Sequence, residues 1–236
     1  GPHVAGLKLE RNSHINGVAV SALNRRGSVH FFPFQLGKPY DDEFIRNPPT
    51  AVESKEHADG REMIAQYESS KYPGLQIGMH VRIDHSGMVR RWFSFSNTTN
   101  RAFDSDLFLT EKFRANGGNA ALPFDGKILE ARSETHAGYG LWQGDRLSEN
   151  WMFNHSGDAT IGIFWEPEAT VTTAEWFLAA EHNVGKLNPG EVKTTPAITA
   201  AVDVFETWNE CRSFAIGKYA TFDPVEETLE LCEIGR

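Results

Sequence analysis

The fold of this chain is decided by residues 76–97, which read QIGMHVRIDHSGMVRRWFSFSN. Val81 and Ile83 alternate with polar residues before a turn at 84–87. The segment that returns from the turn carries on one face Val89, Arg91, Phe93 and Phe95. Successive side chains of a strand point to opposite faces, so a period of two indicates a half-buried strand. We therefore predict an antiparallel hairpin over residues 79–97.

Similar apolar runs separated by turn-forming residues extend along the chain. A second hairpin is expected over residues 18–32, around Asn24-Arg25-Arg26-Gly27. Further strands are predicted at 106–113, 139–142, 151–153, 161–165, 175–180 and 197–205. In 187–191 (LNPGE), Pro and Gly occupy the second and third positions of a type II turn. Because no alternation of strands with helices appears, we predict a mainly β fold, a large antiparallel β-sandwich.

Two segments depart from the strand pattern. Residues 37–71 are polar and contain three prolines, which favours a long excursion over the surface with at most a helical turn or two over 57–67. Residues 206–216 have the spacing of a short amphipathic helix that carries Trp208, Cys211 and Phe214. The sandwich is thus expected to include one or two short helices.

Length and composition limit the classes of function. A chain of 236 residues suits one β-sandwich domain spanning residues 1–236. Mean hydropathy is -0.42, and no apolar run approaches the roughly 18 residues of a membrane span. The net charge is -9 without a cluster of Lys or Arg, so the chain would repel phosphate backbones. We expect neither a membrane nor nucleic acid as a partner.

The two cysteines and the chain ends bear on compartment and context. Cys211 and Cys232 lack metal-ligand spacing. A pair of free thiols is favoured, as is usual in the cytoplasm. The alternative, one disulfide in a protein secreted after removal of a leader, stays open. Gly1-Pro2 is typical of what a protease leaves when it removes a tag. Residues 225–234 alternate apolar and acidic residues like an edge strand, which needs a cover. We expect a domain excised from a longer chain, with neighbouring domains as partners.

No nucleotide-binding loop, dinucleotide-binding glycine pattern, zinc-peptidase motif or serine-hydrolase elbow occurs in the sequence. His80 and His85 flank the best hairpin and are expected to face solvent. None of the histidines has the spacing of a metal cluster. We therefore expect no cofactor and no metal.

A neutral saccharide, bound weakly, is the ligand that suits this acidic, aromatic-rich chain. Segments 93–97 and 151–155 both carry an Asn near the end of an apolar strand, where the side chain commonly caps a turn. The functional alternative places on one face, as donors to sugar hydroxyls, Asn100, Arg101, Asn154 and His155. Trp142, among glycines and polar residues, is either a platform for a sugar ring or a core residue.

The element order, the strand-Asn-turn pattern and the closing turn at 187–191 together resemble the galactose mutarotase-like β-supersandwich over residues 75–216. That fold occurs in aldose 1-epimerases and in accessory domains of carbohydrate-active enzymes. The resemblance to the epimerases implies a His general acid and a Glu general base. His155 matches the acid by position, and Glu166 or Glu191 the base.

Three functions stay open at this point. The chain is a carbohydrate-associated module, contacting substrate or scaffolding a larger carbohydrate-active enzyme; a stand-alone aldose 1-epimerase-type isomerase; or a purely structural β-sandwich of a large multidomain protein. The Arg and the second His that the epimerase pattern implies are not recognisable in the sequence. We therefore favour the module and expect no strong mutarotase activity from this chain alone.

Overall fold

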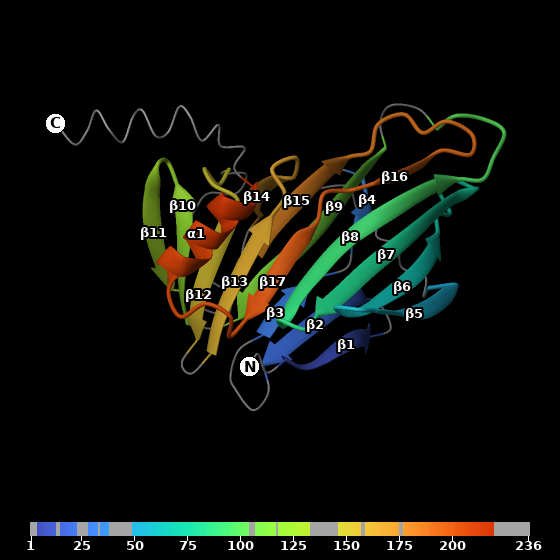
Figure 1. Cartoon of the computed structure of the whole chain (residues 1–236). Coiled ribbons are helices and arrows are strands. Elements are labelled where there is room, and N and C mark those ends of the chain that lie inside the picture. Colours follow the sequence, from blue (N-terminus) through green and yellow to red (C-terminus); the bar gives the residue numbers. More distant parts are fainter. Residues whose placement is uncertain are drawn as a thin grey trace.

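The structure, a computed structural model, describes residues 4–12, 15–22, 28–32, 34–37, 49–103, 107–116, 118–132, 146–156, 159–174 and 177–219. These residues form two antiparallel sheets that face each other, with one helix outside them (Figure 1). Most of the described residues lie in strands, and 12 lie in the helix. The predicted mainly β sandwich is therefore confirmed.

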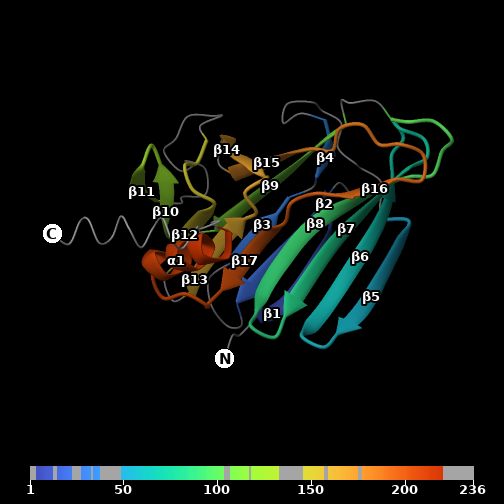
Figure 2. The ribbon, with the colours of Figure 1, turned by 45° about the horizontal axis from the view of Figure 1, so that its top comes forward.

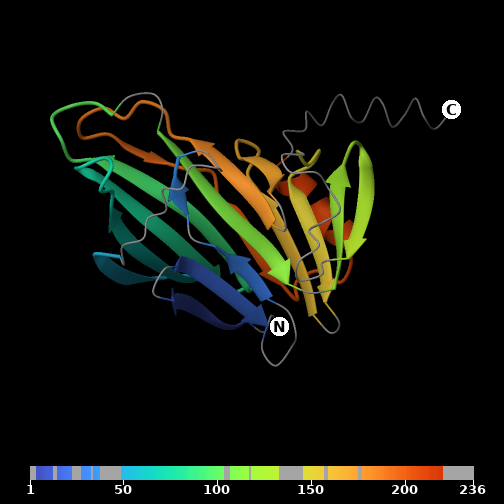
Figure 3. The same ribbon diagram turned by 180° about the vertical axis from the view of Figure 1, so that it is seen from behind.

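One sheet has seven strands and is seen in front in the view from behind (Figure 3). Its strands are β1 (Val4–Asn12), β2 (Ile15–Ala22), β3 (Ser28–Phe31), β4 (Gln35–Leu36), β9 (Phe108–Asn116), β14 (Thr170–Ala174) and β15 (Phe177–Asn183). They follow the order β1-β2-β3-β9-β15-β14, and β4 also pairs with β9. Pairing of β2 with β3 confirms the predicted hairpin over residues 18–32.

The other sheet has ten strands. They are β5 (Ala51–His57), β6 (Gly60–Glu68), β7 (Leu75–Asp84), β8 (Met88–Asn97), β10 (Asn119–Phe124), β11 (Lys127–Arg132), β12 (Trp151–Ser156), β13 (Ala159–Trp165), β16 (Val192–Thr194) and β17 (Ile198–Val202). Their order is β11-β10-β12-β13-β17-β8-β7-β6-β5, with β16 also paired to β8. The hairpin of β7 and β8 is the one that the period-two pattern predicts.

The core lies between the sheets and follows from that period of two. The side chains that point inward from the ten-stranded sheet include Ile77, Met79, Val81, Val89, Phe93 and Phe95. The facing sheet contributes Phe31, Leu109 and Phe113. All nine are at most 1% exposed, and the Phe113 ring lies 6.2 Å from that of Trp165. Burying one such side chain stabilises the fold by about 1.5–3 kcal/mol before entropy is counted.

A charged cluster lies within this apolar core. Arg91, Glu111 and His182 are each at most 3% exposed. His182 Nε2 donates to Glu111 Oε1 at 2.8 Å, and Arg91 Nε lies 3.5 Å from Glu111 Oε2. The Arg91 guanidinium donates to the Phe32 carbonyl at 3.3 and 3.4 Å and lies over the Phe93 ring. The arginine on the predicted inward face is therefore paired in the core.

The helix α1 (Trp208–Tyr219) covers one part of the outer face of the ten-stranded sheet, over β12 and β13 (Figure 1). Thr207 caps its start, where its Oγ1 accepts a hydrogen bond from the Glu210 amide at 3.3 Å. The Trp208 ring stacks on Trp151 with centroids 6.1 Å apart. The helix predicted over residues 206–216 is confirmed, beginning two residues later and ending three residues later than expected.

The segment 37–71 differs most from the prediction. Instead of an irregular segment with helical turns over 57–67, β5 and β6 form an antiparallel hairpin at the edge of the sheet, so the prediction is wrong there, while residues 38–48 lie outside the described residues. Six of the seven residues of β5 are exposed, and no apolar period marks the strand. The loop Ala58-Asp59 followed by Gly60 is a hairpin signal that the sequence does contain.

Several smaller features complete the comparison with the sequence. The hairpin of β10 and β11 and the strand β14 were not predicted. The predicted turn at 187–191 is present, since Gly190 has a φ of 72° and the Glu191 amide donates to the Asn188 carbonyl at 3.0 Å. The strand predicted at 139–142 lies outside the described residues.

Cys211 is a free thiol on the buried, sheet-facing side of α1, and burial raises its pKa to about 12. It is therefore an inert core residue. Cys232 lies outside the described residues. Within the described part of the chain, no helix is long and apolar enough to cross a membrane.

Candidate functional site

The outer face of β6, β7 and β8 is the part of the ten-stranded sheet that α1 leaves uncovered, and no other described element lies over it (Figures 1 and 2). We call it the open face. Most of its outward-pointing side chains are polar or aromatic, with Ile64 and Met88 as apolar exceptions, and the other face of these strands fills the core. The polar and aromatic side chains include Glu62, Gln66, His80, Arg90, Trp92 and Ser94.

Four of the polar groups on and beside the open face form a continuous line of hydrogen bonds. Ser94 Oγ lies 2.9 Å from His80 Nε2, and His80 Nδ1 lies 2.7 Å from Glu62 Oε1. His57 Nε2 reaches the other oxygen, Glu62 Oε2, at 2.9 Å. A carboxylate only accepts, so a neutral His80 carries its hydrogen on Nδ1 and accepts the Ser94 hydroxyl hydrogen at Nε2. Hydrogen-bond donation therefore runs in one direction, from Ser94 to His80 and from His80 to Glu62.

Glu62 is the anchor of this line. Its side chain is 10% exposed and that of His80 is 16% exposed. Burial raises the pKa of Glu62, but the hydrogen bonds from His80 and His57 outweigh that effect and bring the pKa below its ordinary value. Glu62 is therefore ionised at neutral pH and holds both imidazoles in place.

Trp92 supplies an aromatic surface beside the line. Its partner across β7 and β8 is His80, and the two rings stack with centroids 4.9 Å apart and planes 13° apart. The Arg90 guanidinium lies 5.4 Å from the indole centroid, in the range of a cation–π contact. Arg90 also forms an ion pair with Glu166 at 2.5 Å. The stacked Trp92 indole holds the face of the His80 ring, and the hydrogen bonds to Ser94 and Glu62 hold its edge.

Gly78 makes room for this arrangement. It pairs across the strands with Ser94. A Cβ on Gly78 would stand 2.5 Å from Ser94 Oγ and 3.1 Å from His80 Nε2, with Gln66 Nε2 at 3.6 Å. A side chain at position 78 would therefore push the Ser94 hydroxyl or the His80 ring out of place, and three polar groups converge above this glycine.

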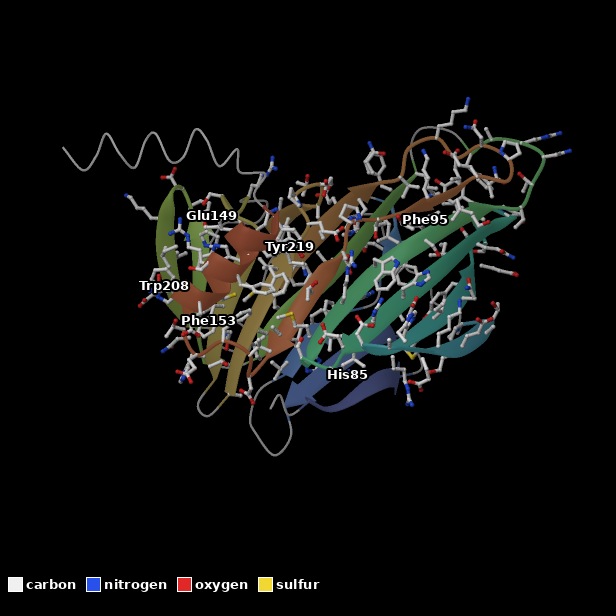
Figure 4. The ribbon with its side chains drawn as sticks, viewed as in Figure 1. His85, Phe95, Glu149, Phe153, Trp208 and Tyr219 are labelled. Atoms are coloured by element: carbon white, nitrogen blue, oxygen red, sulfur yellow. The ribbon has the colours of Figure 1, made fainter. Side chains whose placement is uncertain are left out.

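A shallow pocket of about 220 Å³ lies next to the line, towards the end of α1. Its charged lining residues are Asp59, Arg82, Asp84, Arg90 and Lys218. Burial lowers the pKa of Lys218, and the charge of Arg90 lowers it further. Charges of both signs share this small space, so the pocket suits a polar ligand without a large net charge. Figure 4 shows His85 at the β7–β8 turn and Tyr219 at the end of α1.

The predicted ligand residues that follow β8 lie on an exposed turn. Asn100 and Arg101 are exposed there. Asn97 shapes the turn, because its Nδ2 donates to the Arg101 carbonyl at 2.7 Å and its Oδ1 accepts from the Thr99 amide at 2.9 Å. The interpretation of this Asn as a turn cap is confirmed.

The predicted ligand residues of β12 do not share a face. Asn154 is fully buried, and its side-chain amide has no hydrogen-bond partner within the described residues. His155 is exposed on the other face. The register places His155 near the Met88 end of β8, through β13 and β17, whereas Arg101 follows the opposite end. The four residues are not brought together, and a role for any of them in binding stays a prediction. Trp142 lies outside the described residues.

The predicted catalytic pair is also separated. His155 is paired with Thr160 near the start of β13, and Glu166 follows the last residue of that strand. The Glu166 carboxylate accepts hydrogen bonds from Arg90 at 2.5 Å and from the Ala197 amide at 2.9 Å. This geometry does not place an acid and a base on two sides of one ligand.

The line from Ser94 to Glu62 was missed at the sequence level. His80 was expected to face solvent, but it is half-buried and held on both nitrogens. Glu62 fell in the segment 57–67, where helical turns were expected. The alternation of β7 does place His80 on the outward face. Glu62 comes beside it through the pairing of β6 with β7, whose connection at 69–74 contains the turn-forming Pro73 and Gly74.

No metal centre is formed by the described residues, where no group of three or more His, Cys, Asp or Glu side chains is arranged to hold an ion. His57 and His80 donate to different oxygens of Glu62 instead of converging on one point. The polar side chains of the line are therefore linked to one another by hydrogen bonds.

No protein-family model and no curated protein match the sequence. Solved structures match at the level of the fold. An α-N-acetylgalactosaminidase from Bifidobacterium bifidum, in complex with GalNAc, aligns with 83% of this chain and 34% of its own, at 8% identity and a TM-score of 0.50. A TPR-domain containing protein from Parabacteroides distasonis aligns with 82% of this chain and 48% of its own, at 7% identity and a TM-score of 0.49.

A putative aldose 1-epimerase from Escherichia coli K12 covers 86% of this chain and 98% of its own, at 10% identity and a TM-score of 0.39. The chain spans about half the length of the Parabacteroides protein and about a third of the galactosaminidase. At such identities the likeness shows the fold alone. The chain thus has a β-sandwich fold that is also found within a carbohydrate-active enzyme.

Proposed function

We propose that this chain is a carbohydrate-associated β-sandwich module that contacts a saccharide as part of a larger carbohydrate-active enzyme. The observation that carries the proposal is the open face, where hydrogen bonds fix His80 and Ser94 beside the indole of Trp92. A sugar ring presents hydroxyl groups at its edge and C–H groups on its faces. Fixed polar groups beside an apolar ring match both.

The charge distribution supports a neutral saccharide as the ligand. The chain has a net charge of -9, which disfavours anionic ligands. The pocket beside the open face carries charges of both signs. Gln66 adds an uncharged amide near Ser94, suited to a hydroxyl group.

Arg90 occupies the space over Trp92 that a sugar ring would take. Its side chain is 49% exposed, and its ion pair with Glu166 is at the surface. Such pairs contribute about 0–1 kcal/mol, so moving Arg90 aside costs little. A ligand on the indole would replace one weak contact by the burial of a larger apolar area.

Trp92→Ala is expected to weaken binding of a neutral saccharide by about 1 kcal/mol, close to fivefold, because the stacking surface is lost. Isothermal titration calorimetry with a panel of neutral mono- and oligosaccharides, N-acetylgalactosamine among them, measures the effect. His80→Gln is expected to weaken binding as well, since the orientation of Ser94 depends on this ring.

Two control variants test whether the saccharide binds at the open face or near the ligand residues that were predicted from the sequence. Arg101→Ala and His155→Ala alter exposed residues at the two ends of the sheet and should leave binding unchanged. Loss of binding in either control, with Trp92→Ala unaffected, would move the site to that end. If no saccharide of the panel binds the wild-type chain, the purely structural β-sandwich is the better description.

An aldose 1-epimerase-type activity is the alternative, and we expect it to be absent or weak. The separation of His155 from Glu166 along β13 supports this expectation, because the reaction needs an acid and a base on two sides of the sugar. Polarimetry on freshly dissolved α-glucose and α-galactose tests the expectation. A large acceleration of mutarotation that His155→Ala abolishes would favour the enzyme.

A further inference from the structure

We propose that Ser94, His80 and Glu62 form a nucleophile, base and orienting group for acyl transfer, and that the open face accepts a small carboxylic ester. The inference goes beyond saccharide binding and does not depend on it. It rests on the connectivity of the hydrogen bonds, which join the serine hydroxyl to one imidazole nitrogen and the carboxylate to the other.

The geometry meets the requirements of a general base. Ser94 Oγ and His80 Nε2 are 2.9 Å apart, within the range for proton transfer along a hydrogen bond. Glu62 accepts from Nδ1 at 2.7 Å, which selects the tautomer with a free lone pair on Nε2 and stabilises the imidazolium that forms when the serine proton moves. The three residues come from β8, β7 and β6, so rigid neighbouring strands hold the distances.

Two further contacts hold the orienting group and the base. His57 donates to the second oxygen of Glu62 at 2.9 Å, so the carboxylate cannot rotate away from His80. Trp92 stacks on the imidazole at 4.9 Å and fixes the ring plane. Because the ring is held at its edge and on its face, the position of Nε2 relative to Ser94 is determined before a substrate arrives.

The serine is reachable and has a hydrogen-bond donor nearby. Ser94 is half-buried and points outward on the open face. Its hydroxyl lies above Gly78, where Gln66 Nε2 also converges. An amide N–H from a side chain can stabilise the oxyanion of a tetrahedral intermediate, as backbone donors do at other sites. Gln66 is the residue that we assign to this role.

The chemistry balances without a cofactor. Ser94 Oγ forms a bond to the ester carbonyl carbon as its proton passes to His80 Nε2, and the carbonyl electron pair moves onto the oxygen. The tetrahedral intermediate then breaks the bond to the leaving alkoxy group, which takes the proton from His80 and departs as an alcohol. Water repeats the sequence on the acyl-serine, releases the carboxylic acid and restores the hydroxyl.

The test is covalent labelling of the whole chain with a fluorophosphonate, a reagent that phosphonylates activated serines. Intact mass should show one adduct, and peptide mapping should place it on Ser94. Ser94→Ala should abolish the adduct, and His80→Gln should slow labelling by at least about 100-fold, the lower range for loss of a general base. Ser96→Ala is the matched control, because Ser96 follows on the same face of β8 and should leave labelling unchanged.

Variants of Glu62 and Gly78, the two positioning residues, should change the labelling rate in a way that a purely structural role would not. Glu62→Gln should slow labelling strongly and Glu62→Asp should restore part of the rate, while both keep a folded circular dichroism spectrum. Gly78→Ala should slow labelling because its Cβ displaces the Ser94 hydroxyl. Hydrolysis of 4-nitrophenyl acetate should follow the same order among the variants.

The proposal is overturned if native wild-type chain acquires no adduct, or if the adduct persists in Ser94→Ala. It is also overturned if His80→Gln is labelled as fast as wild type. A chain that binds saccharide in calorimetry but is not labelled keeps the proposed function and loses this inference. A chain that is labelled at Ser94 but binds no saccharide keeps this inference and loses the proposed function.

Discussion

Arg91→Met is expected to lower the free energy of unfolding by about 3–5 kcal/mol, the range for breaking a buried ion pair by removing one partner. Arg91 and Glu111 have no exposed side-chain surface, and Arg91 Nε lies 3.5 Å from Glu111 Oε2. Burial lowers the pKa of the guanidinium, while the charge of Glu111 opposes that shift. Removing the arginine leaves a buried carboxylate whose remaining partner is His182.

Chemical denaturation followed by circular dichroism measures the change. Adding Glu111→Gln to Arg91→Met should recover most of the loss, because a neutral amide can keep the hydrogen bond with His182 and carries no uncompensated charge. Arg61→Met is the control, since that arginine pairs with Glu56 at the surface and should cost at most about 1 kcal/mol. A loss below about 1 kcal/mol in Arg91→Met would show that the cluster adds little to stability.

The part of the fold that the sequence predicts is the part where one face is buried and the other is polar. On both sides of the turn at 84–87, residues 79–97 alternate, because every second side chain of the two strands enters the core. β5 gives no such signal, because it lies at the sheet edge with nearly every side chain exposed. The prediction of helical turns over 57–67 rests on a weak apolar period there, whereas in the structure β6 pairs with both β5 and β7.

The candidate site could not be predicted for a different reason. Ser94, His80 and Glu62 are separated by 14 and 18 residues, and only the pairing register brings them together. A shift of one residue would turn Glu62 into the core, and composition does not specify the register. Arg91 shows the same limit: its inward position follows from alternation, but its partner Glu111 lies on the opposite sheet.

Phe164→Ala is expected to cost about 3–5 kcal/mol, as truncation of a buried phenylalanine usually does. Phe164 is fully buried on the outer face of the ten-stranded sheet, where α1 packs. Its ring lies 5.2 Å from that of Phe214 and 6.1 Å from that of Tyr219, so it contacts the helix at two positions along its length. The cavity would therefore loosen α1 as well as the sheet.

The consequence for the site comes through the end of that helix. Lys218 lines the pocket beside the open face, and its amine lies 5.2 Å from the Phe164 ring. Hydrogen exchange should show faster exchange across 208–219 in Phe164→Ala and unchanged exchange in β7, because the β6–β7–β8 part packs against the other sheet. Phe124→Ala, at a half-buried position of β10, serves as the control and should leave α1 protected. Unchanged protection of α1 in Phe164→Ala would mean that Trp151 and Trp208 hold the helix without this ring.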